Sequence, residues 1–159
     1  MTNGADADRD AAAKALAFIR LTLGMMFVWV FFENLGKGLY TPAGYAGLIK
    51  VYLDHGQAPA FWKSFMAMAA AKSAVTAPLQ GFTEISLGGL LVLGLLTRPA
   101  ALVAFLFLTS LWVSEWGTAW IWELLVPMMA ALGLLMGRAG RKWGLDGFLA
   151  RRYPGSRLW

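Results

Sequence analysis

The stretch EISLGGLLVLGLLTRPAALVAFLFLTSLWVSE, residues 84–115, decides the fold. It holds two apolar runs that meet at Arg98, and each run ends at a glutamate, Glu84 for the first and Glu115 for the second. As α-helices, such charge-free runs are about 18–24 Å long. Their boundary residues, with arginine extending toward the headgroups, lengthen them toward a hydrocarbon core of roughly 30 Å. The stretch therefore predicts a transmembrane helical hairpin that turns at Arg98.

Two further apolar runs repeat this pattern of charges. The run before the hairpin lies between Arg20 and Glu33, and the run after it lies between Glu123 and Arg138. We therefore expect an all-α membrane protein with a bundle of four transmembrane helices. The predicted spans cover about residues 15–35, 79–97, 99–116 and 119–137. They form a transmembrane domain over residues 15–137, after a polar tail at 1–14 and before a basic segment at 138–159.

The composition agrees with a membrane protein and excludes several other classes. Of 159 residues, 58% are hydrophobic and 14% are charged, whereas soluble domains carry about 25% charged residues. This excludes an ordinary soluble enzyme, a disordered protein and a collagen-like chain. The chain has no cysteine and one histidine, which excludes disulfides, thiolate metal sites and bis-histidine haem ligation within one chain. We expect no metal site, and we find no nucleotide-binding or nucleic-acid-binding motif.

The basic residues predict the orientation of the chain. Ten of the 14 lysines and arginines fall on the same side of the predicted bundle as Arg98, and four lysines fall on the opposite side. By the positive-inside rule, both termini are cytoplasmic. The first span has no cleavage site after it and is expected to remain as an anchor. The basic C-terminal segment suits anionic lipid headgroups better than nucleic acid.

The long linker between the first two spans is expected to contain two helices. Apolar residues recur at helical spacing from Tyr45 to Leu53, and His55-Gly56 ends this pattern. We predict interfacial helices at about 43–55 and 60–75, which would cover the bundle above the four glutamates.

Prolines and the C-terminal segment give further expectations. Pro78 and Pro99 are predicted to open the second and third spans, because proline suits the first turn of a helix. A short interfacial helix is expected after Gly140, with Trp143 at headgroup depth and Asp146 as a helix N-cap.

The glutamates at the outer ends of the spans are candidate site residues. The carbonyl of Glu123 loses its helical donor because Pro127 has no N–H, and glycines follow Glu84 and permit close approach of a helix or ligand. We expect Lys37 to lie within salt-bridge or water-bridge reach of Glu84, with Glu33 or Glu123 nearby. Glu33 is a competing partner of Lys37, because the two residues have helical i, i+4 spacing. The alternative, which stays open, is that these carboxylates are ordinary hydrated boundary residues. For Glu115, at a predicted hairpin tip, this second interpretation is favoured.

Three segments resemble known family motifs. They are Gly36-Lys37, the stretch EISLGGLLVLGLLTRPAAL at 84–102, and GRKWGLDGFLARR at 140–152. The chain from Phe18 onward resembles the DoxX/DoxD family of small four-helix membrane proteins, and its tryptophans and the WEL at 122–124 favour the DoxD branch. The resemblance implies a bacterial or archaeal inner-membrane protein. It also implies a subunit of a thiosulfate:quinone oxidoreductase.

The resemblance leads to three functional hypotheses. In the first, the chain is a quinone-linked redox subunit, in which Glu84 and Glu123 exchange protons while Lys37, Glu33 and Trp122 surround the quinone headgroup. In the second, it is a non-catalytic anchor or assembly subunit of a larger membrane complex, so that it is no enzyme by itself. A small transporter is the third, and the lack of an inverted repeat disfavours it. In the first two hypotheses, other membrane-protein subunits are expected partners, besides the lipid bilayer.

Overall fold

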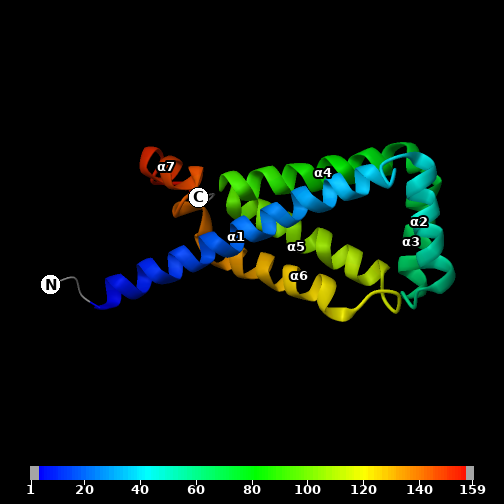
Figure 1. Cartoon of the computed structure of the whole chain (residues 1–159), viewed down its shortest axis with the longest axis horizontal. Helices are drawn as coiled ribbons and strands as arrows, with labels where there is room; N and C mark the ends of the chain where they lie inside the picture. The colour runs from blue at the N-terminus through cyan, green and yellow to red at the C-terminus, as the bar shows by residue number, and fades with distance from the viewer. Residues whose placement is uncertain (1–3, 157–159) are drawn as a thin grey trace.

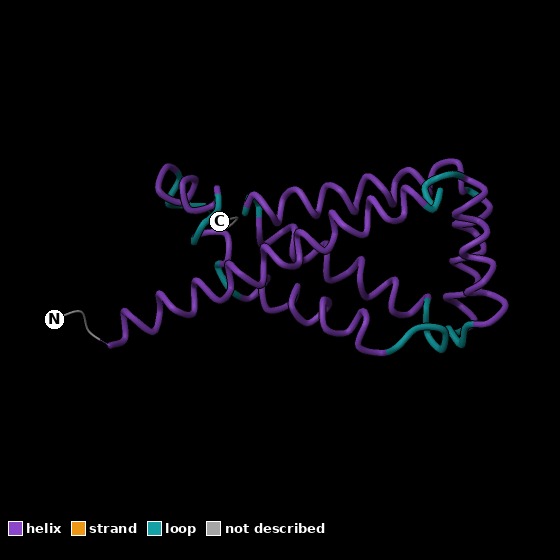
Figure 2. Tube along the Cα trace, viewed as in Figure 1, coloured by secondary structure: helices purple, strands orange, loops and turns teal. Residues whose placement is uncertain are grey.

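The computed structural model describes residues 4–156. Over this range the regular elements are seven α-helices and one short 3₁₀-helix, joined by turns and loops, with no strand (Figures 1 and 2). The elements in chain order are α1 (Gly4–Gly36), α2 (Pro42–His55), α3 (Ala60–Ala71), α4 (Ser73–Leu93), α5 (Thr97–Ser114), α6 (Ile121–Met136), the 3₁₀-helix η1 (Ala139–Arg141) and α7 (Leu145–Arg152). The all-α prediction is confirmed.

Four long helices form a bundle that two shorter helices cover at one end. Helix α1 packs along α4 and α5 packs along α6, while α2 and α3 lie across the end where α1 finishes and α4 begins (Figure 1). Helix α7 lies at the opposite end, near the middle of the long helix α1, whose first turns extend beyond the bundle. At the covered end lie Glu33 in the last turn of α1, Glu115 directly after α5 and Glu123 in the first turn of α6, whereas Glu84 lies midway along α4 and not at its end as expected.

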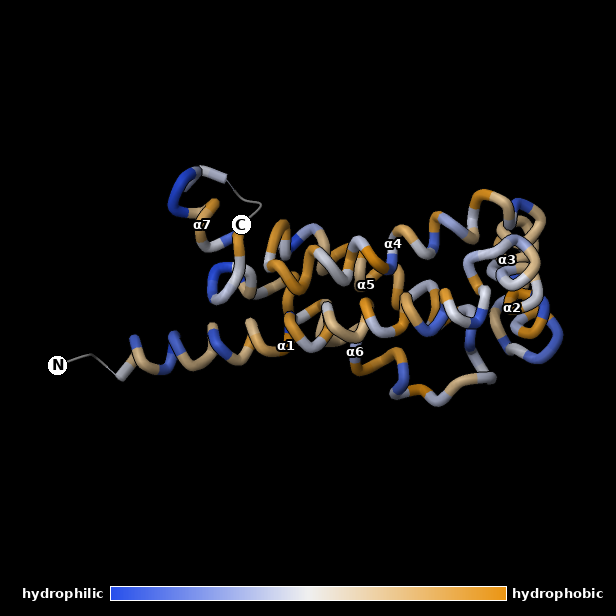
Figure 3. The backbone as a smooth tube through the Cα atoms, turned by 45° about the horizontal axis from the view of Figure 1, so that its top comes forward, coloured by the Kyte–Doolittle hydropathy of each residue, from blue (hydrophilic) through white to orange (hydrophobic). Residues whose placement is uncertain are grey.

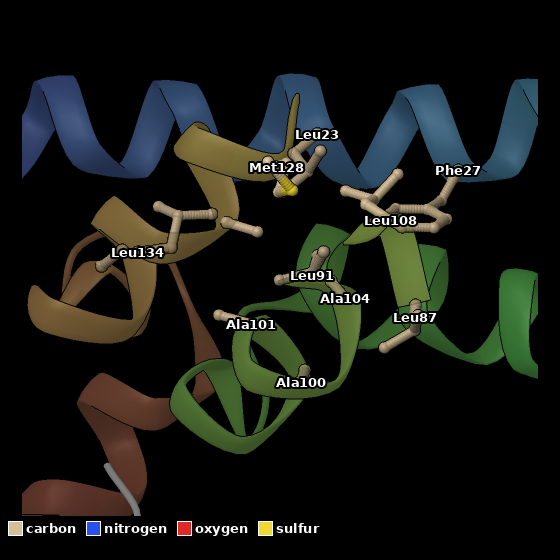
Figure 4. Packing of buried hydrophobic residues seen from close by; sticks show 12 residues of the cluster. Leu23, Phe27, Leu87, Leu91, Ala100, Ala101, Ala104, Leu108, Met128 and Leu134 are labelled. Carbon is tan, nitrogen blue, oxygen red and sulfur yellow. The ribbon is translucent and has the colours of Figure 1, made fainter. Parts of the chain in front are cut away.

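The core is apolar and fills the space between the four long helices. Figure 4 shows side chains from α1, α4, α5 and α6 pointing toward one another. Small residues on α5 let the helices approach closely, since Ala101 and Ala104 are fully buried. Gly24 and Gly88 do the same between α1 and α4, because a Cβ on Gly88 would lie 2.7 Å from a methyl group of Val28. Gly88 therefore lets α1 approach α4 closely, as expected, whereas a Cβ on Gly89 would meet no atom within 4 Å.

The exterior of the bundle has the character of a lipid-facing surface. Helices α1 and α5 are each long and apolar enough to cross a membrane, and α6 is a shorter apolar helix. Large apolar side chains on the outside remain exposed, including Trp29 at 75% and Met136 at 79%. Figure 3 shows hydrophilic residues gathered at the first turns of α1, at α7 and around α2 and α3, with hydrophobic residues between them. Exposed apolar side chains of this extent are typical of surfaces that bind a membrane or another protein.

Several element boundaries differ from those expected. Helix α1 begins at Gly4, so most of the segment expected as a polar tail continues the first helix. Helix α3 ends at Ala71 and α4 begins at Ser73, because the chain turns within the single residue Lys72. The prediction that Pro78 opens the second span is therefore wrong, and Pro78 lies inside α4. Pro99 does lie in the first turn of α5.

The C-terminal segment is fastened to the start of α5 by one carboxylate. The Asp146 side chain accepts hydrogen bonds from the backbone N–H groups of Leu96 at 2.8 Å and Thr97 at 2.9 Å. Asp146 therefore caps α5, some fifty residues earlier in the chain, and not its own helix, whose N-cap is Gly144. The buried Arg20 of α1 completes this junction, since its Nη2 donates to the carbonyl of Trp143 at 2.9 Å.

Candidate functional site

Glu84 is the centre of a buried polar cluster. Its side chain is 1% exposed and accepts three hydrogen bonds from uncharged donors. The Tyr40 hydroxyl donates to Oε2 at 2.5 Å, Asn34 Nδ2 donates to the same oxygen at 3.2 Å, and Gln80 Nε2 donates to Oε1 at 2.9 Å. Because burying an unsatisfied carboxylate is costly, these donors are what permit Glu84 to lie inside an apolar bundle.

Local features of the chain bring the three donors to Glu84. Gln80 precedes Glu84 by one helical turn on α4, and Asn34 lies in the last turn of α1, which packs on α4. Tyr40 lies in the turn after α1, and its ring packs against Gly81, where a Cβ would lie 2.9 Å from the ring. A glycine at position 81 is therefore required for Tyr40 to reach the carboxylate.

A cavity of about 340 Å³ lies beneath α2 and is lined by residues of α1, α2, α4, α5 and α6. Its volume falls within the range of small-molecule sites. Polar groups are concentrated in its lining, alongside apolar walls such as Phe27, Phe107 and Leu108. The polar lining residues are Asn34, Lys37, Tyr52, Gln80, Glu84, Glu115 and Glu123. The cavity therefore combines an apolar body with a few convergent polar groups.

Lys37 forms its ion pair with Glu33 rather than with Glu84. The Lys37 Nζ lies 2.6 Å from Glu33 Oε1, and both side chains are about half exposed. This local i, i+4 contact needs no tertiary packing, whereas Glu84 is satisfied by neutral donors. No direct ion pair therefore joins Lys37 to Glu84, and a water bridge between these two cavity-lining residues stays a prediction.

Glu115 connects the covering helix α2 to the bundle. The Tyr52 hydroxyl donates to Glu115 Oε1 at 2.7 Å. Burial raises the pKa of the Glu115 carboxyl above its ordinary value, the Tyr52 hydrogen bond opposes this shift, and the charge of Glu123 adds to it. Burial likewise raises the pKa of the Tyr52 phenol. Glu115 thus begins the turn between α5 and α6, as expected for a hairpin tip, but it is half-buried and lines the cavity rather than being an ordinary hydrated residue.

The structure brings together some of the expected site residues and separates others. Glu84, Glu123 and Lys37 line the cavity. Glu33 lies outside its lining, and Trp122 is 59% exposed and stacks on Trp120 with ring centroids 5.4 Å apart.

Sequence reasoning missed four polar residues of the site. They are Asn34, Tyr40, Tyr52 and Gln80. Only Gln80 carries a signal in the sequence, namely its i, i+4 spacing to Glu84. Within residues 4–156, no group of three or more His, Cys, Asp or Glu side chains is placed to hold a metal ion.

The fold and the cavity define an all-helical protein with long apolar helices and a buried carboxylate inside its bundle. Residues 16–157 match the protein family described as "TQO small subunit DoxD". This match covers most of the chain, and the chain belongs to this family. No curated protein and no solved structure gives a significant match.

Proposed function

We propose that this chain is the quinone-binding membrane subunit of a thiosulfate:quinone oxidoreductase. The family name supplies the reaction class, and the buried, hydrogen-bonded Glu84 on the wall of the 340 Å³ cavity supports the assignment of the quinone site. We assign only the quinone half of the reaction to this chain. The residues that take electrons from thiosulfate belong to a partner subunit in this proposal.

The cavity suits a quinone headgroup because it offers both apolar walls and proton-exchanging groups. Reduction of a quinone to a quinol consumes two electrons and two protons. In our proposal, the partner subunit supplies both electrons. Glu84 takes up a proton by way of Glu123, which is exposed and also lines the cavity, and passes it to one quinone oxygen. A second proton follows the same route to the other oxygen. The Lys37 ammonium group stabilises negative charge that develops on the other oxygen.

We further propose that all four long helices cross the inner membrane of a bacterium or archaeon, with both termini in the cytoplasm. One contact supports a shared end for the two termini, since the Lys142 Nζ of the C-terminal segment lies 2.5 Å from Asp10 near the start of α1. The excess of basic residues at this end assigns it to the cytoplasm. The Glu84 cavity then lies toward the opposite side of the membrane.

The test is thiosulfate-dependent quinone reduction by the assembled complex that carries Glu84→Gln. The amide keeps the shape of the side chain but cannot take up and release a proton as a carboxyl group does, so we expect turnover to fall on the order of 10²-fold or more. Glu33→Gln is the matched control, because Glu33 lies at the same end of the bundle but outside the cavity lining, and it should retain turnover. Unchanged turnover in Glu84→Gln, in a complex of normal composition and stability, would overturn the proposal.

The second candidate function, a non-catalytic anchor or assembly subunit, is favoured by a different feature. The first turns of α1 extend beyond the bundle as a charged helix (Figure 1), with Asp10 paired to Lys14 at 2.7 Å. Such a projecting helix offers a surface to a partner. If anchoring is the whole function, deletion of residues 4–9 abolishes co-purification of the partner while Glu84→Gln leaves turnover intact.

A further inference from the structure

A second hollow, on the lipid-facing side of the molecule, lies between α1 and α6. It has a volume of about 510 Å³ and a lining that is almost entirely apolar. Among the described residues that line it, Thr22 carries a hydroxyl group, and this hydroxyl donates to the carbonyl of Phe18 at 3.1 Å. The groove therefore offers shape and dispersion contacts but no free hydrogen-bonding side chain, which suits a hydrocarbon chain.

The groove and the Glu84 cavity adjoin each other. Met26 of α1 and Pro127 of α6 line both of them. From this shared wall, the groove extends along α1 toward its start and along α6 toward Gly133. A polar cavity and an apolar groove, the two environments that a molecule with a polar head and a long apolar tail needs, therefore lie on either side of Met26 and Pro127.

We propose that the groove between α1 and α6 binds the isoprenoid tail of the quinone whose headgroup occupies the Glu84 cavity. This inference rests on the proposed function. A phospholipid acyl chain fits less well, since its headgroup lies at the membrane surface and its apolar methyl end would then abut the polar cavity. A quinone places its polar end there and its apolar end in the groove.

The chain offers a clean way to block this groove. A Cβ added at Gly133, which lines the groove, would meet no atom within 4 Å, so Gly133→Phe fills the groove without a clash at the backbone. Gly89 on α4 is equally open and lies outside the groove, which makes Gly89→Phe the matched control. Thr22→Trp is a second blocking variant, from the opposite wall.

The experiment uses the assembled complex in lipid nanodiscs and a ubiquinone analogue that carries a photoreactive diazirine in its isoprenoid tail. We expect labelling on α1 and α6 that excess unlabelled long-tailed ubiquinone displaces. In Gly133→Phe and in Thr22→Trp, labelling of these helices should fall on the order of tenfold, whereas Gly89→Phe should be labelled like the wild type. A tail-free ubiquinone should still bind to both blocking variants with the wild-type affinity.

Other outcomes separate this inference from the proposed function. Saturable binding of tail-free ubiquinone, together with labelling spread evenly over all lipid-facing helices, would overturn the tail site and leave the quinone cavity standing. A diazirine-labelled phospholipid that labels the groove and is not displaced by quinone would assign the groove to lipid and would also overturn the inference. Absence of saturable binding by any quinone would overturn the proposed function and the tail site together.

Discussion

Replacement of Asp146 by alanine is expected to release the C-terminal segment from the bundle. The Asp146 carboxylate is 2% exposed and accepts the N–H groups of Leu96 and Thr97 at the start of α5. Its charge also favours the buried guanidinium of Arg20. Each hydrogen bond to a charged group contributes about 1.5–3 kcal/mol, and Asp146→Ala removes two such bonds. Because these contributions overlap, we expect Asp146→Ala to lose about 3–5 kcal/mol of unfolding free energy.

The assay is equilibrium unfolding of the purified chain in detergent micelles, followed by tryptophan fluorescence. Asp146→Asn keeps one carbonyl oxygen as an acceptor, so it should lose roughly half as much as the alanine variant. Asp8→Ala is the control, since Asp8 is exposed near the start of α1 and its loss should change stability by less than about 0.5 kcal/mol. A loss below about 1 kcal/mol in Asp146→Ala would refute the capping role.

Three further predictions address other parts of the structure. Gly94→Ala should lower the unfolding free energy by about 3 kcal/mol or more, because Gly94 has φ +63° and an added Cβ would lie 1.5 Å from Nη1 of the buried Arg20. Gly89→Ala is the control, since Gly89 lies in open space and the substitution should be tolerated. Equal stability of the two variants would contradict this prediction. Tyr40→Phe removes the hydroxyl donor at 2.5 Å from the buried Glu84 carboxylate. It should lower the unfolding free energy, measured by the same assay, by about 1–3 kcal/mol. An unchanged unfolding free energy would show that this hydrogen bond adds nothing to stability. Glu115→Gln should flatten the dependence of stability on pH, because the folded-state pKa of Glu115 lies above its ordinary value of 4.5. The contribution of Glu115 to stability is present below pH 4.5 and is lost as the pH rises through the folded-state pKa. A variant that keeps the wild-type pH profile would disprove this assignment.

The helices were predictable because their causes are local. Charge-free apolar runs bounded by arginine and glutamate mark the helices of the bundle, and the apolar spacing from Tyr45 onward predicts α2 to within one residue at its start. Gly56 ends α2 as expected, since its N–H donates to the carbonyl of Tyr52. The start of α4 was missed because proline in a second helical turn removes only one hydrogen bond, so Pro78 marks no boundary.

The candidate site was only partly predictable because its contacts join distant segments. Glu84 stands out in the sequence as a carboxylate beside an apolar run, and the glycines after it indicate close packing. Nothing local indicates that Tyr40 reaches it, because that contact depends on the space left by Gly81 forty-one positions further along the chain. The sequence likewise leaves open whether Lys37 pairs with Glu33 or with Glu84, since the outcome depends on the three neutral donors that satisfy Glu84.

The central claim is that the Glu84 cavity binds a quinone headgroup, and direct binding of a tail-free ubiquinone tests it most directly. Binding is measured by isothermal titration to the purified chain in nanodiscs, for the wild type, Glu84→Gln and Glu33→Gln. We predict saturable one-site binding to the wild type and to Glu33→Gln, and at least tenfold weaker binding to Glu84→Gln, which corresponds to about 1.4 kcal/mol. Equal binding to the wild type and Glu84→Gln, or no saturable binding to the wild type, would contradict the assignment of this cavity to quinone.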